Sequence, residues 1–376
     1  MSETRRLLAV NFRDPAHPEA GGAELHLEEI LLEAARRGWQ VTWLASGFRG
    51  APPEGEHRGL RIVRRGDWWN FNLLVPGVLA RDFSGANAPH LVVEDINKVP
   101  CFTAQWTRSP VAVIVPHLFG TTAFQEASLP VAAYVVGLEH FIPSAYRGSR
   151  FLVISESTRD DLVGRGVPRE RIAVIHCGMN HERYSIDPSV PKAGRPSLVF
   201  VGRLRRYKGL DWVLRTLPRV RESVPDLQLE VIGDGPWQEA LVRQVGILGL
   251  ADAVRFHGFL PFAEKVRLIR QAWALVQPSP KEGWGLTVIE AGACGTAVVA
   301  ADSPGLRDSV QRDRTGLLVP FGDDAALAGA LARVLTDAPL RERLAGVGAR
   351  WAAGFRWDDC ARRSFDALTG EDGHGR

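Results

Sequence analysis

Long apolar runs are missing from this 376-residue chain. Its longest apolar stretches, 110–115 and 129–138, fall short of the roughly 18–20 residues that a membrane-spanning helix requires. The start of the chain also lacks the apolar centre of a signal peptide, because the short run 7–10 gives way at once to Asn11. We therefore expect a cytoplasmic protein, whose contact with a membrane would be peripheral at most, on the inner face.

Cysteine is scarce and scattered, at Cys101, Cys177, Cys294 and Cys360. No C-x-x-C pair occurs, so we expect neither a disulfide framework nor a zinc site, and a reducing compartment fits. Net charge is small as well, because 46 Lys and Arg stand against 43 Asp and Glu. That balance argues against a protein that binds nucleic acid through bulk charge.

The composition that remains is ordinary for a soluble globular protein, with 45% hydrophobic and 24% charged residues. The length suits two domains of about 150–200 residues. Short β-rich runs alternate with amphipathic segments, which is typical of parallel sheets with helical crossovers. In the first half this pattern predicts strands at 7–11, 40–45, 60–63, 91–93, 111–115, 151–154 and 173–176, and helices at 23–37, 73–81, 130–141 and 157–165.

The segment 181–196 is polar and rich in Pro and Gly, so we interpret it as a linker between a first domain, 1–180, and a second domain, 197–355. The second domain repeats the alternation. The sequence thus predicts an α/β protein with two doubly wound, Rossmann-like parallel-sheet domains that face each other across a cleft. Ligands of such sheets bind beyond the carboxyl ends of the strands. The second domain has predicted strands at 197–201, 228–232, 254–257, 274–277, 297–300 and 316–319, and predicted helices at 210–224, 236–248, 262–272, 286–293 and 325–335.

Two motifs of the second domain directly follow predicted strands. The loop 202–209 brings Arg203 and Lys208 close together, and such cations stabilise a diphosphate that gains negative charge as it departs. Glu282 and Glu290 flank a glycine-rich turn that leads into an apolar helix. Carboxylates accept hydrogen bonds from hydroxyls, and the bare amides at a helix start suit a phosphate. A ligand with many hydroxyls next to phosphate is a nucleotide sugar.

Together the two motifs resemble those of the retaining glycosyltransferases of family 4, which have the GT-B fold. The loop 202–209 matches the family pattern GR-x4-KG at every fixed position, and 290–299 matches EAxACGxxVV. Gly292 and Ala297 stand where Met and Pro are usual, and Trp284 replaces a commoner Phe, without loss of a ligand group. The resemblance covers essentially the whole chain, and it implies that a last helix, 356–370, returns to pack on the first domain.

The resemblance also assigns roles to residues at matching positions. Arg203 and Lys208 would bind the donor diphosphate, Glu282 the hydroxyls of the transferred sugar, and Glu290 the ribose. The catalytic residues would be Arg203, Lys208, Glu282 and His117. The remaining donor-binding positions come from the family's glycine loops, strand ends and helix start: Gly21, Gly22, Gly233, Gly235, Gly258, Phe259, Gly283, Trp284, Gly285, Leu286 and Thr287.

Some of these positions also have an ordinary structural interpretation. His117 ends a predicted strand, where a histidine is often only packed or solvated, and the pair 21–22 is compatible with a plain tight turn. The loop 94–98 either lines the acceptor site or is solvated. For the aromatic segment 67–74 we expect most rings to lie in the core, and a surface that faces acceptor or membrane is the alternative.

The chain contains no Asp-x-Asp triplet, with which the metal-dependent class of glycosyltransferases commonly holds a divalent ion. We therefore expect no metal site and no cofactor other than the nucleotide-sugar co-substrate. The sequence predicts a metal-independent hexosyltransferase of glycan, glycolipid or cell-surface polysaccharide biosynthesis. Its acceptor hydroxyl would belong to a glycan, a lipid-linked glycan or a small molecule, and its membrane contact, if any, would use the first domain. A nucleotide-sugar epimerase, a sugar phosphorylase and a non-catalytic nucleotide-binding subunit are the alternatives.

Overall fold

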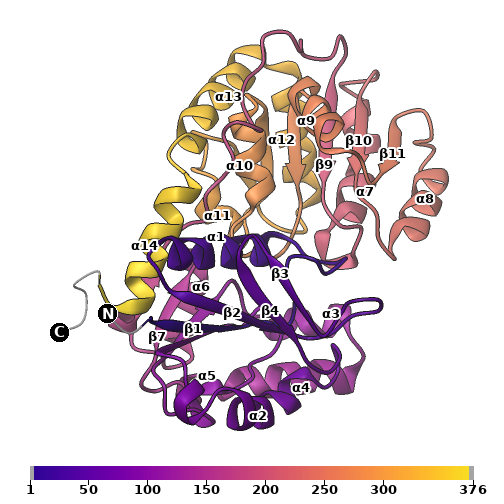
Figure 1. Cartoon of the computed structure of the whole chain (residues 1–376). Coiled ribbons are helices and arrows are strands. Elements are labelled where there is room, and N and C mark those ends of the chain that lie inside the picture. The colour runs from indigo at the N-terminus through magenta and orange to yellow at the C-terminus, as the bar shows by residue number, and fades with distance from the viewer. Residues whose placement is uncertain (1–3, 372–376) are drawn as a thin grey trace. The chain divides into compact units, whose positions relative to one another are not determined.

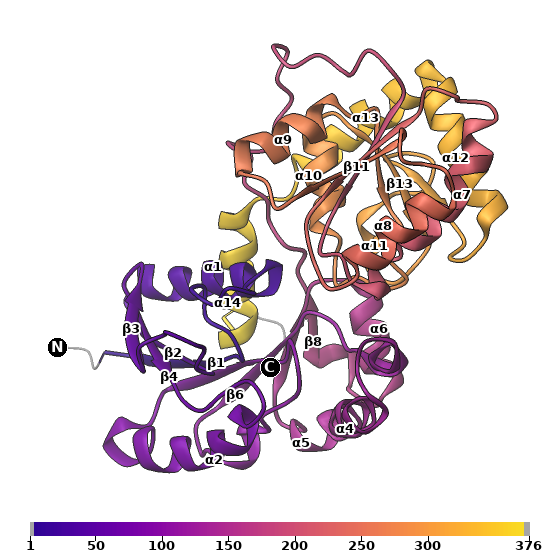
Figure 2. The same cartoon turned by 90° about the vertical axis from the view of Figure 1, so that its right-hand side faces the viewer.

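The computed structural model describes residues 4–371, apart from the side chains of residues 125 and 126. The chain divides into two compact units: unit 1 is Met1–Gly178 with Trp357–Arg376, and unit 2 is Met179–Arg356. In each unit, helices cover a largely parallel sheet (Figures 1 and 2). The α/β class with two doubly wound, mainly parallel sheets, expected from the sequence, is therefore confirmed.

Unit 1 contains an eight-stranded sheet in the order β3-β4-β2-β1-β5-β6-β7-β8. Neighbouring strands pair in parallel, except that β3 and β4 form an antiparallel hairpin. The strands are β1 (Arg6–Val10), β2 (Gln40–Ala45), β3 (Glu54–His57), β4 (Leu60–Arg64), β5 (Leu91–Asp95), β6 (Val111–Val115), β7 (Arg150–Val153) and β8 (Ile172–Val174).

The two faces of this sheet carry different helices, as the strand alternation requires. In β1, Leu7 and Ala9 join the core beneath α1 and α14, whereas Leu8 and Val10 join the core beneath α2. Figure 1 shows α1 and α14 on one face of the sheet and α2 on the other. The helices of unit 1 are α1 (Gly22–Arg36), α2 (Phe71–Asp82), α3 (Ala123–Glu126), α4 (Leu129–His140), α5 (Ile142–Ala145), α6 (Glu156–Gly164) and α14 (Trp357–Thr369).

The C-terminal helix α14 belongs to unit 1 although it follows the whole of unit 2 in the sequence. It packs beside α1, where the Arg37 guanidinium lies 2.6 Å from the Asp366 carboxylate. Phe365 is buried and meets the Trp39 ring edge-on, with centroids 5.7 Å apart. Aromatic contacts of this kind add to the free energy of apolar burial, so α14 is an integral part of the first core.

Unit 2 contains a six-stranded, entirely parallel sheet in the order β11-β10-β9-β12-β13-β14. The predicted elements of the second domain match those observed closely, with the same order along the chain. The strands are β9 (Ser197–Val201), β10 (Gln228–Ile232), β11 (Val254–Gly258), β12 (Ala274–Gln277), β13 (Ala297–Ala301) and β14 (Leu317–Val319), and the helices are α7 (Leu210–Arg221), α8 (Gln238–Ile247), α9 (Phe262–Gln271), α10 (Leu286–Ala293), α11 (Leu306–Ser309), α12 (Asp324–Thr336) and α13 (Ala338–Ala352).

The segment 181–196, interpreted from the sequence as a linker, lies inside unit 2 and is fastened to it. Lys192 donates to the carbonyl of Ala272 and to the Thr296 hydroxyl, both at 2.9 Å. Arg270 of α9 donates to the carbonyl of Ser185 at 2.8 Å. The Pro and Gly content of this segment reflects an irregular backbone that follows the surface of unit 2.

The aromatic segment 67–74 is only partly buried, so the expectation that most of its rings lie in the core is wrong. Phe71 is fully buried and starts the apolar face of α2 that Val75 continues. Trp68 and Trp69 precede that face, in the turn before the helix, and are 75% and 63% exposed. The same exposed character continues on α2 at Leu73, which is 66% exposed.

Candidate functional site

The strand order of unit 2 defines one place where a ligand is expected. The chain passes from the central strand β9 outwards to β10 and β11, then returns to β12 on the other side of β9. The loops that leave β9 and β12 therefore run in opposite directions, which opens a crevice at the carboxyl ends of these two strands. The loop 202–209 follows β9, and Glu282 lies in the loop after β12. The two motifs found in the sequence thus meet at this switch point.

Lys208 and Glu282 form a largely buried ion pair at that point. The Lys208 ammonium lies 2.6 Å from the Glu282 carboxylate, and the side chains are 15% and 14% exposed. Gln277, the last residue of β12, donates to the same carboxylate oxygen at 3.1 Å. Burial acts to lower the pKa of Lys208, but attraction to Glu282 outweighs it and the net direction is upward. Lys208 is therefore a permanent cation.

Arg203 contributes to the same electrostatic environment. Its positive charge acts to lower the pKa of Lys208, because the two cations repel each other. Lys208 is also 5.0 Å from the centre of the Tyr207 ring. The loop therefore concentrates two positive charges beside one carboxylate, an arrangement that suits a ligand with phosphate and hydroxyl groups side by side.

Glycines let the neighbouring loops pack closely against this cationic loop. Gly233 has φ 125°, and a Cβ at this position would lie 2.1 Å from the carbonyl oxygen of Gly202. A Cβ on Gly235 would lie 2.5 Å from the carbonyl oxygen of Leu204. The Leu204 amide in turn donates to the carbonyl of Asp234 at 2.7 Å. Gly233 and Gly235 thus have a structural role that holds the Arg203 loop in place.

A third loop supports the backbone of Glu282. The Glu282 amide donates to the carbonyl of Pro304 at 3.1 Å, and a Cβ on Gly305 would lie 2.2 Å from the carbonyl oxygen of Glu282. Helix α10 begins just beyond, with Gly285 as its N-cap and no capping side chain. Gly283 precedes this N-cap, and Leu286 and Thr287 open the helix. The helix start thus offers its first amides to an anion.

Trp284 differs from the other residues of this turn in where its side chain lies. The side chain is 2% exposed and packs edge-on against Phe355, with centroids 5.3 Å apart. The ring is therefore enclosed within unit 2 and is hardly accessible to solvent. Phe259, in contrast, is 85% exposed just after Gly258 at the end of β11. An exposed ring at a strand end is suited to stack on a nucleobase.

Glu290 lies on α10 and has two partners outside the motifs identified in the sequence. Its carboxylate is 3.8 Å from the Lys265 ammonium of α9. It also interacts with the Tyr184 hydroxyl, which comes from the segment interpreted as a linker. Burial raises the pKa of Glu290, while Lys265 and the hydrogen bond from Tyr184 act in the opposite direction. No spacing motif signals either residue.

Unit 1 has a comparable switch point between β1 and β5. Gly21 is the N-cap of α1, and the Glu24 carboxylate accepts a hydrogen bond from its amide at 2.7 Å. Gly22 is the first residue of the helix. The other oxygen of Glu24 accepts from the Asn97 amide group at 2.8 Å. The glycine pair therefore stands beside a buried polar cluster.

The loop 94–98, expected either to line an acceptor site or to be solvated, is mostly buried. Glu94, Asp95 and Asn97 are 1%, 2% and 7% exposed. Glu94 accepts from the amides of Cys101 and Thr103. Burial, aided by the charges of Glu24 and Glu94, raises the pKa of Asp95 well above its ordinary value. This part of unit 1 is thus a buried polar cluster and not a solvated loop, and its role at an acceptor site stays a prediction.

His117 follows β6 and is half-buried, with its ring 5.0 Å from that of Phe119. Both residues belong to unit 1. Its location at the carboxyl end of a strand agrees with the sequence interpretation. Its role in catalysis stays a prediction.

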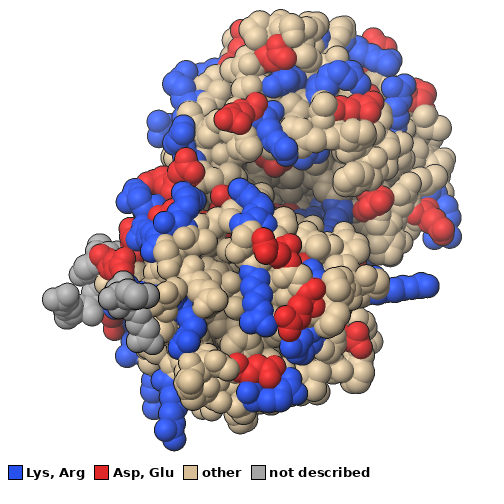
Figure 3. Space-filling model, in the orientation of Figure 1, with Lys and Arg blue, Asp and Glu red and all other residues tan. Residues whose placement is uncertain are grey.

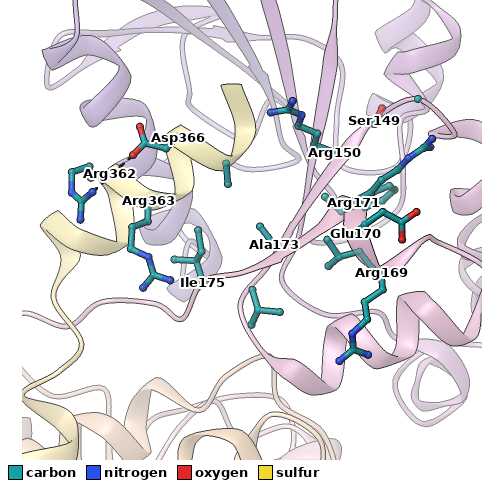
Figure 4. Close-up of a pocket in the computed structure, with 15 residues that line it drawn as sticks. Ser149, Arg150, Arg169, Glu170, Arg171, Ala173, Ile175, Arg362, Arg363 and Asp366 are labelled. Carbon is teal, nitrogen blue, oxygen red and sulfur yellow. Dashed lines mark ion pairs between the residues drawn. The ribbon is translucent and has the colours of Figure 1, made fainter. Parts of the chain in front are cut away.

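A cavity of about 1000 Å³ lies elsewhere in unit 1, between β8 and α14 (Figure 4). Several arginines line it, among them Arg169, Arg171, Arg362 and Arg363. In Figure 4 their guanidinium groups point in different directions. Because they do not converge on one point, the cavity lacks the geometry of an anion site, and the candidate residues of the sequence lie outside its walls.

Metal sites and membrane-spanning helices are two further features that the described residues could form. Among residues 4–371, no group of three or more His, Cys, Asp or Glu side chains is placed to hold a metal ion. None of the helices in this range has both the length and the apolar content that a bilayer crossing requires. On the face drawn in Figure 3, basic and acidic side chains are interspersed.

Two family models match the chain, one after the other. The model described as Glycosyltransferase Family 4 matches residues 20–183, and the model described as Glycosyl transferases group 1 matches residues 184–351. One relative matches over nearly its full length: the GDP-mannose-dependent alpha-(1-6)-phosphatidylinositol monomannoside mannosyltransferase of Mycolicibacterium smegmatis is 31% identical over 94% of this chain and 96% of its own. A D-inositol 3-phosphate glycosyltransferase of Streptomyces bingchenggensis is 32% identical over 62% of this chain. The chain spans about half the length of that relative, 55%.

Solved structures show the same fold. Sucrose-phosphate synthase from Thermosynechococcus elongatus has a TM-score of 0.81 at 21% identity, covering 99% of this chain and 100% of its own. The Anabaena protein Alr3699/HepE, solved in complex with UDP-glucose, has a TM-score of 0.74 at 19% identity, covering 97% and 99%. These likenesses show the fold of the chain, beyond its sequence motifs.

Proposed function

Since the chain belongs to the glycosyl transferases group 1 of glycosyltransferase family 4, we propose that it is a hexosyltransferase that moves a sugar from a nucleoside diphosphate to an acceptor hydroxyl. The observation that carries this proposal is the Lys208–Glu282 pair at the switch point of unit 2. A cation for phosphate and a carboxylate for sugar hydroxyls are 2.6 Å apart there. A ligand with phosphate and hydroxyl groups as neighbours can contact both side chains at once.

The same pair accounts for departure of the nucleoside diphosphate. Without donor, Glu282 neutralises Lys208. When the donor binds, its diphosphate becomes the partner of Lys208 and Arg203, and the Glu282 carboxylate turns to the sugar hydroxyls. As the bond from the anomeric carbon to the phosphate oxygen breaks, the charge on that oxygen grows and the two cations stabilise it more strongly than before. Such differential stabilisation lowers the barrier.

The proposed transfer retains the anomeric configuration and uses no metal ion. The acceptor oxygen forms its bond to the anomeric carbon on the face from which the diphosphate leaves, and the acceptor proton passes to the departing phosphate oxygen. Gln277 donates to the Glu282 carboxylate, and in the proposed reaction this carboxylate binds sugar hydroxyls and does not act as a nucleophile. Arg203, Lys208 and the start of α10 supply the positive potential that a metal supplies in other transferases.

The donor class is a nucleoside diphosphate hexose. This agrees with the mannosyltransferase relative, which is GDP-mannose-dependent, and with the Anabaena protein solved with UDP-glucose. The acceptor is a hydroxyl of a glycan, a lipid-linked glycan or a small molecule. A cytoplasmic location is part of the proposal, because all four cysteines are buried free thiols, which suit a reducing compartment.

A peripheral contact of unit 1 with the membrane is supported by one surface. We define the apolar surface as the exposed side chains of α2 and α4 with the turn before α2: Trp68, Trp69, Leu73, Leu74, Leu129, Val131 and Tyr134. A hydrogen bond of 2.7 Å from Asn72 to the Tyr134 hydroxyl joins the two helices. The one carboxylate of α4, Glu139, is buried and accepts from backbone amides. The exposed part of α4 thus carries no acidic group that anionic lipid would repel.

The proposal is tested by donor binding followed by turnover. Thermal unfolding should be measured with UDP, GDP, ADP and dTDP, since a ligand that binds the native state raises the melting temperature. The sugar nucleotides of the best binder are then offered with hydroxyl acceptors. Formation of a glycoside with retained configuration supports the proposal. Conversion of the donor sugar without an acceptor, or dependence on inorganic phosphate, would contradict it.

A further inference from the structure

The segment 181–196 brings Tyr184 close to Glu290, the residue proposed to bind the ribose. Tyr184 is 6% exposed and packs edge-on against Phe262 at the start of α9, with centroids 5.2 Å apart. Arg270 holds the backbone that follows it through the carbonyl of Ser185. The position of the Tyr184 hydroxyl is therefore fixed by packing on both sides, as a positioning group requires.

Lys265 and Tyr184 form a chain of contacts that ends at Glu290. The Lys265 ammonium lies 2.5 Å from the Tyr184 hydroxyl oxygen and 3.8 Å from Oε2 of Glu290. It also lies over the rings of Tyr184 and Phe262, at 5.1 and 5.3 Å from their centres. All three polar side chains are largely shielded, with Lys265 22% and Glu290 17% exposed. In such surroundings each hydrogen bond restricts its partner strongly.

The donor and acceptor roles in this chain follow from the chemistry of the groups. An ammonium only donates, so the Tyr184 oxygen accepts from Lys265. The single hydroxyl proton of Tyr184 is then available to the Glu290 carboxylate, with which it interacts. Burial and the charge of Glu290 raise the pKa of Tyr184, so the phenol keeps this proton. Lys265 and Tyr184 therefore both act on the Glu290 carboxylate, Lys265 from the side of its Oε2.

We propose that Tyr184 and Lys265 are positioning residues for recognition of the donor ribose. They hold the Glu290 carboxylate in one orientation, so that it accepts hydrogen bonds from the ribose hydroxyls. This inference rests on the proposed function, because it assumes that Glu290 meets a nucleotide. It adds that the affinity for those hydroxyls depends on a phenol contributed by the segment that precedes β9.

The test compares nucleotides with and without ribose hydroxyls. Whichever of UDP and GDP binds the wild type more tightly is titrated calorimetrically, together with its 2′,3′-dideoxy counterpart. Tyr184→Phe keeps the ring that packs on Phe262 and removes only the hydroxyl. We expect it to weaken binding of the ribonucleotide by about 10-fold, the worth of a hydrogen bond to a charged group, and binding of the dideoxynucleotide less than twofold.

Further variants separate positioning from general damage. Lys265→Met should also weaken binding of the ribonucleotide more than binding of the dideoxynucleotide. The double variant Glu290→Gln with Tyr184→Phe should bind the ribonucleotide no more weakly than Glu290→Gln alone, since the hydroxyl acts through the carboxylate. Tyr134→Phe, which removes a phenol in unit 1, is the matched control and should bind both nucleotides as the wild type does. Equal loss for both nucleotides in Tyr184→Phe, or wild-type affinity, overturns the inference.

Failure of this inference and failure of the proposed function give different results. If Lys208→Met and Glu290→Gln weaken nucleotide binding while Tyr184→Phe does not, the donor site stands and the positioning role is refuted. If neither Lys208→Met nor Glu290→Gln changes binding of either nucleotide, the donor site itself is refuted.

Discussion

Lys208 and Glu282 are 74 positions apart in the sequence, yet their charged groups are 2.6 Å apart at the carboxyl ends of neighbouring strands. The two side chains form a direct ion pair, so removal of the cation tests its role in the proposed reaction. Lys208→Met should reduce turnover by about 100-fold or more, because it removes stabilisation of the leaving diphosphate. Steady-state kinetics with the identified donor measure this loss.

The matched control is Arg206→Ala in the same loop. Arg206 is exposed and stacks over Trp237 at 5.8 Å, and it lies outside the family pattern. Its loss should change turnover less than threefold. A comparable loss in both variants would show that general positive charge, and not the placement of Lys208, matters.

A second prediction concerns the contact between Gly233 and Gly202. Gly233→Ala places a Cβ 2.1 Å from a backbone oxygen, at a φ of 125° that side chains avoid. We expect a loss of about 3 kcal/mol or more in the stability of unit 2, and weaker nucleotide binding, because the Arg203 loop must shift. Denaturation in urea and nucleotide titration measure the two effects.

Gly246→Ala in α8 is the control for that substitution, since a Cβ there meets nothing within 4 Å. It should stabilise the protein by about 0.5–1 kcal/mol, because alanine favours the helix. Similar effects of both substitutions would mean that the close approach of the loops is not maintained in solution.

The sequence predicted the part of the site that depends on strand ends. Apolar runs located β9 and β12, and the motifs after them identified Arg203, Lys208 and Glu282 as candidates. Because parallel strands end at the same edge of a sheet, proximity followed from the fold class. The prediction succeeded where position along one element determines position in space.

The rest depended on contacts between elements far apart in the sequence. Tyr184 looked like part of a linker, and only packing on Phe262 places it beside Glu290. Trp284 was assigned to the donor site, but its ring packs against that of Phe355, near the end of unit 2 in the sequence. Strand β3, with the sequence EGEH, was missed because a polar edge strand has no apolar alternation to reveal it.

His26 should make the protein sensitive to acid. It is 1% exposed, and burial lowers its pKa from 6.5 to about 4. Well above pH 6.5 the imidazole is neutral in both the folded and the unfolded state, so this group does not change the free energy of unfolding with pH. As the pH falls below 6.5 the unfolded state takes up the proton first, so stability is lost until the folded state also protonates near pH 4.

The expected loss from this one group between pH 7.5 and 4.5 is about 2–3 kcal/mol. Urea denaturation of the wild type and of His26→Leu at both pH values measures it. The variant should lose less stability by that amount, whereas carboxylates such as Asp95 titrate alike in both proteins and cancel in the difference. An identical pH dependence in the two proteins would show that His26 is solvated or paired in solution.

The apolar surface of unit 1 should bind to lipid vesicles. Trp68→Ser combined with Leu73→Ser should weaken cosedimentation with phosphatidylcholine and phosphatidylglycerol vesicles by about 10-fold or more, since two large apolar side chains no longer enter the interface. Ile247 of α8 is 85% exposed in unit 2, so Ile247→Ser is the control and should bind as the wild type does. Wild-type binding by the double variant would remove the membrane contact from the proposal.

Turnover without a metal ion follows from the fixed cations of the switch point. Arg203 and Lys208 are part of the polypeptide, so chelation should leave their positive potential on the diphosphate intact. Transfer should therefore proceed within twofold of its normal rate after dialysis against EDTA, and added Mg²⁺ or Mn²⁺ should not raise it further. The Lys208→Met variant provides a sharper comparison, because a metal-assisted enzyme would recover part of its lost rate as the divalent ion concentration rises. If EDTA abolishes transfer and Mn²⁺ restores it, the charge that stabilises the leaving group comes from a bound ion, and the role given to Lys208 is wrong.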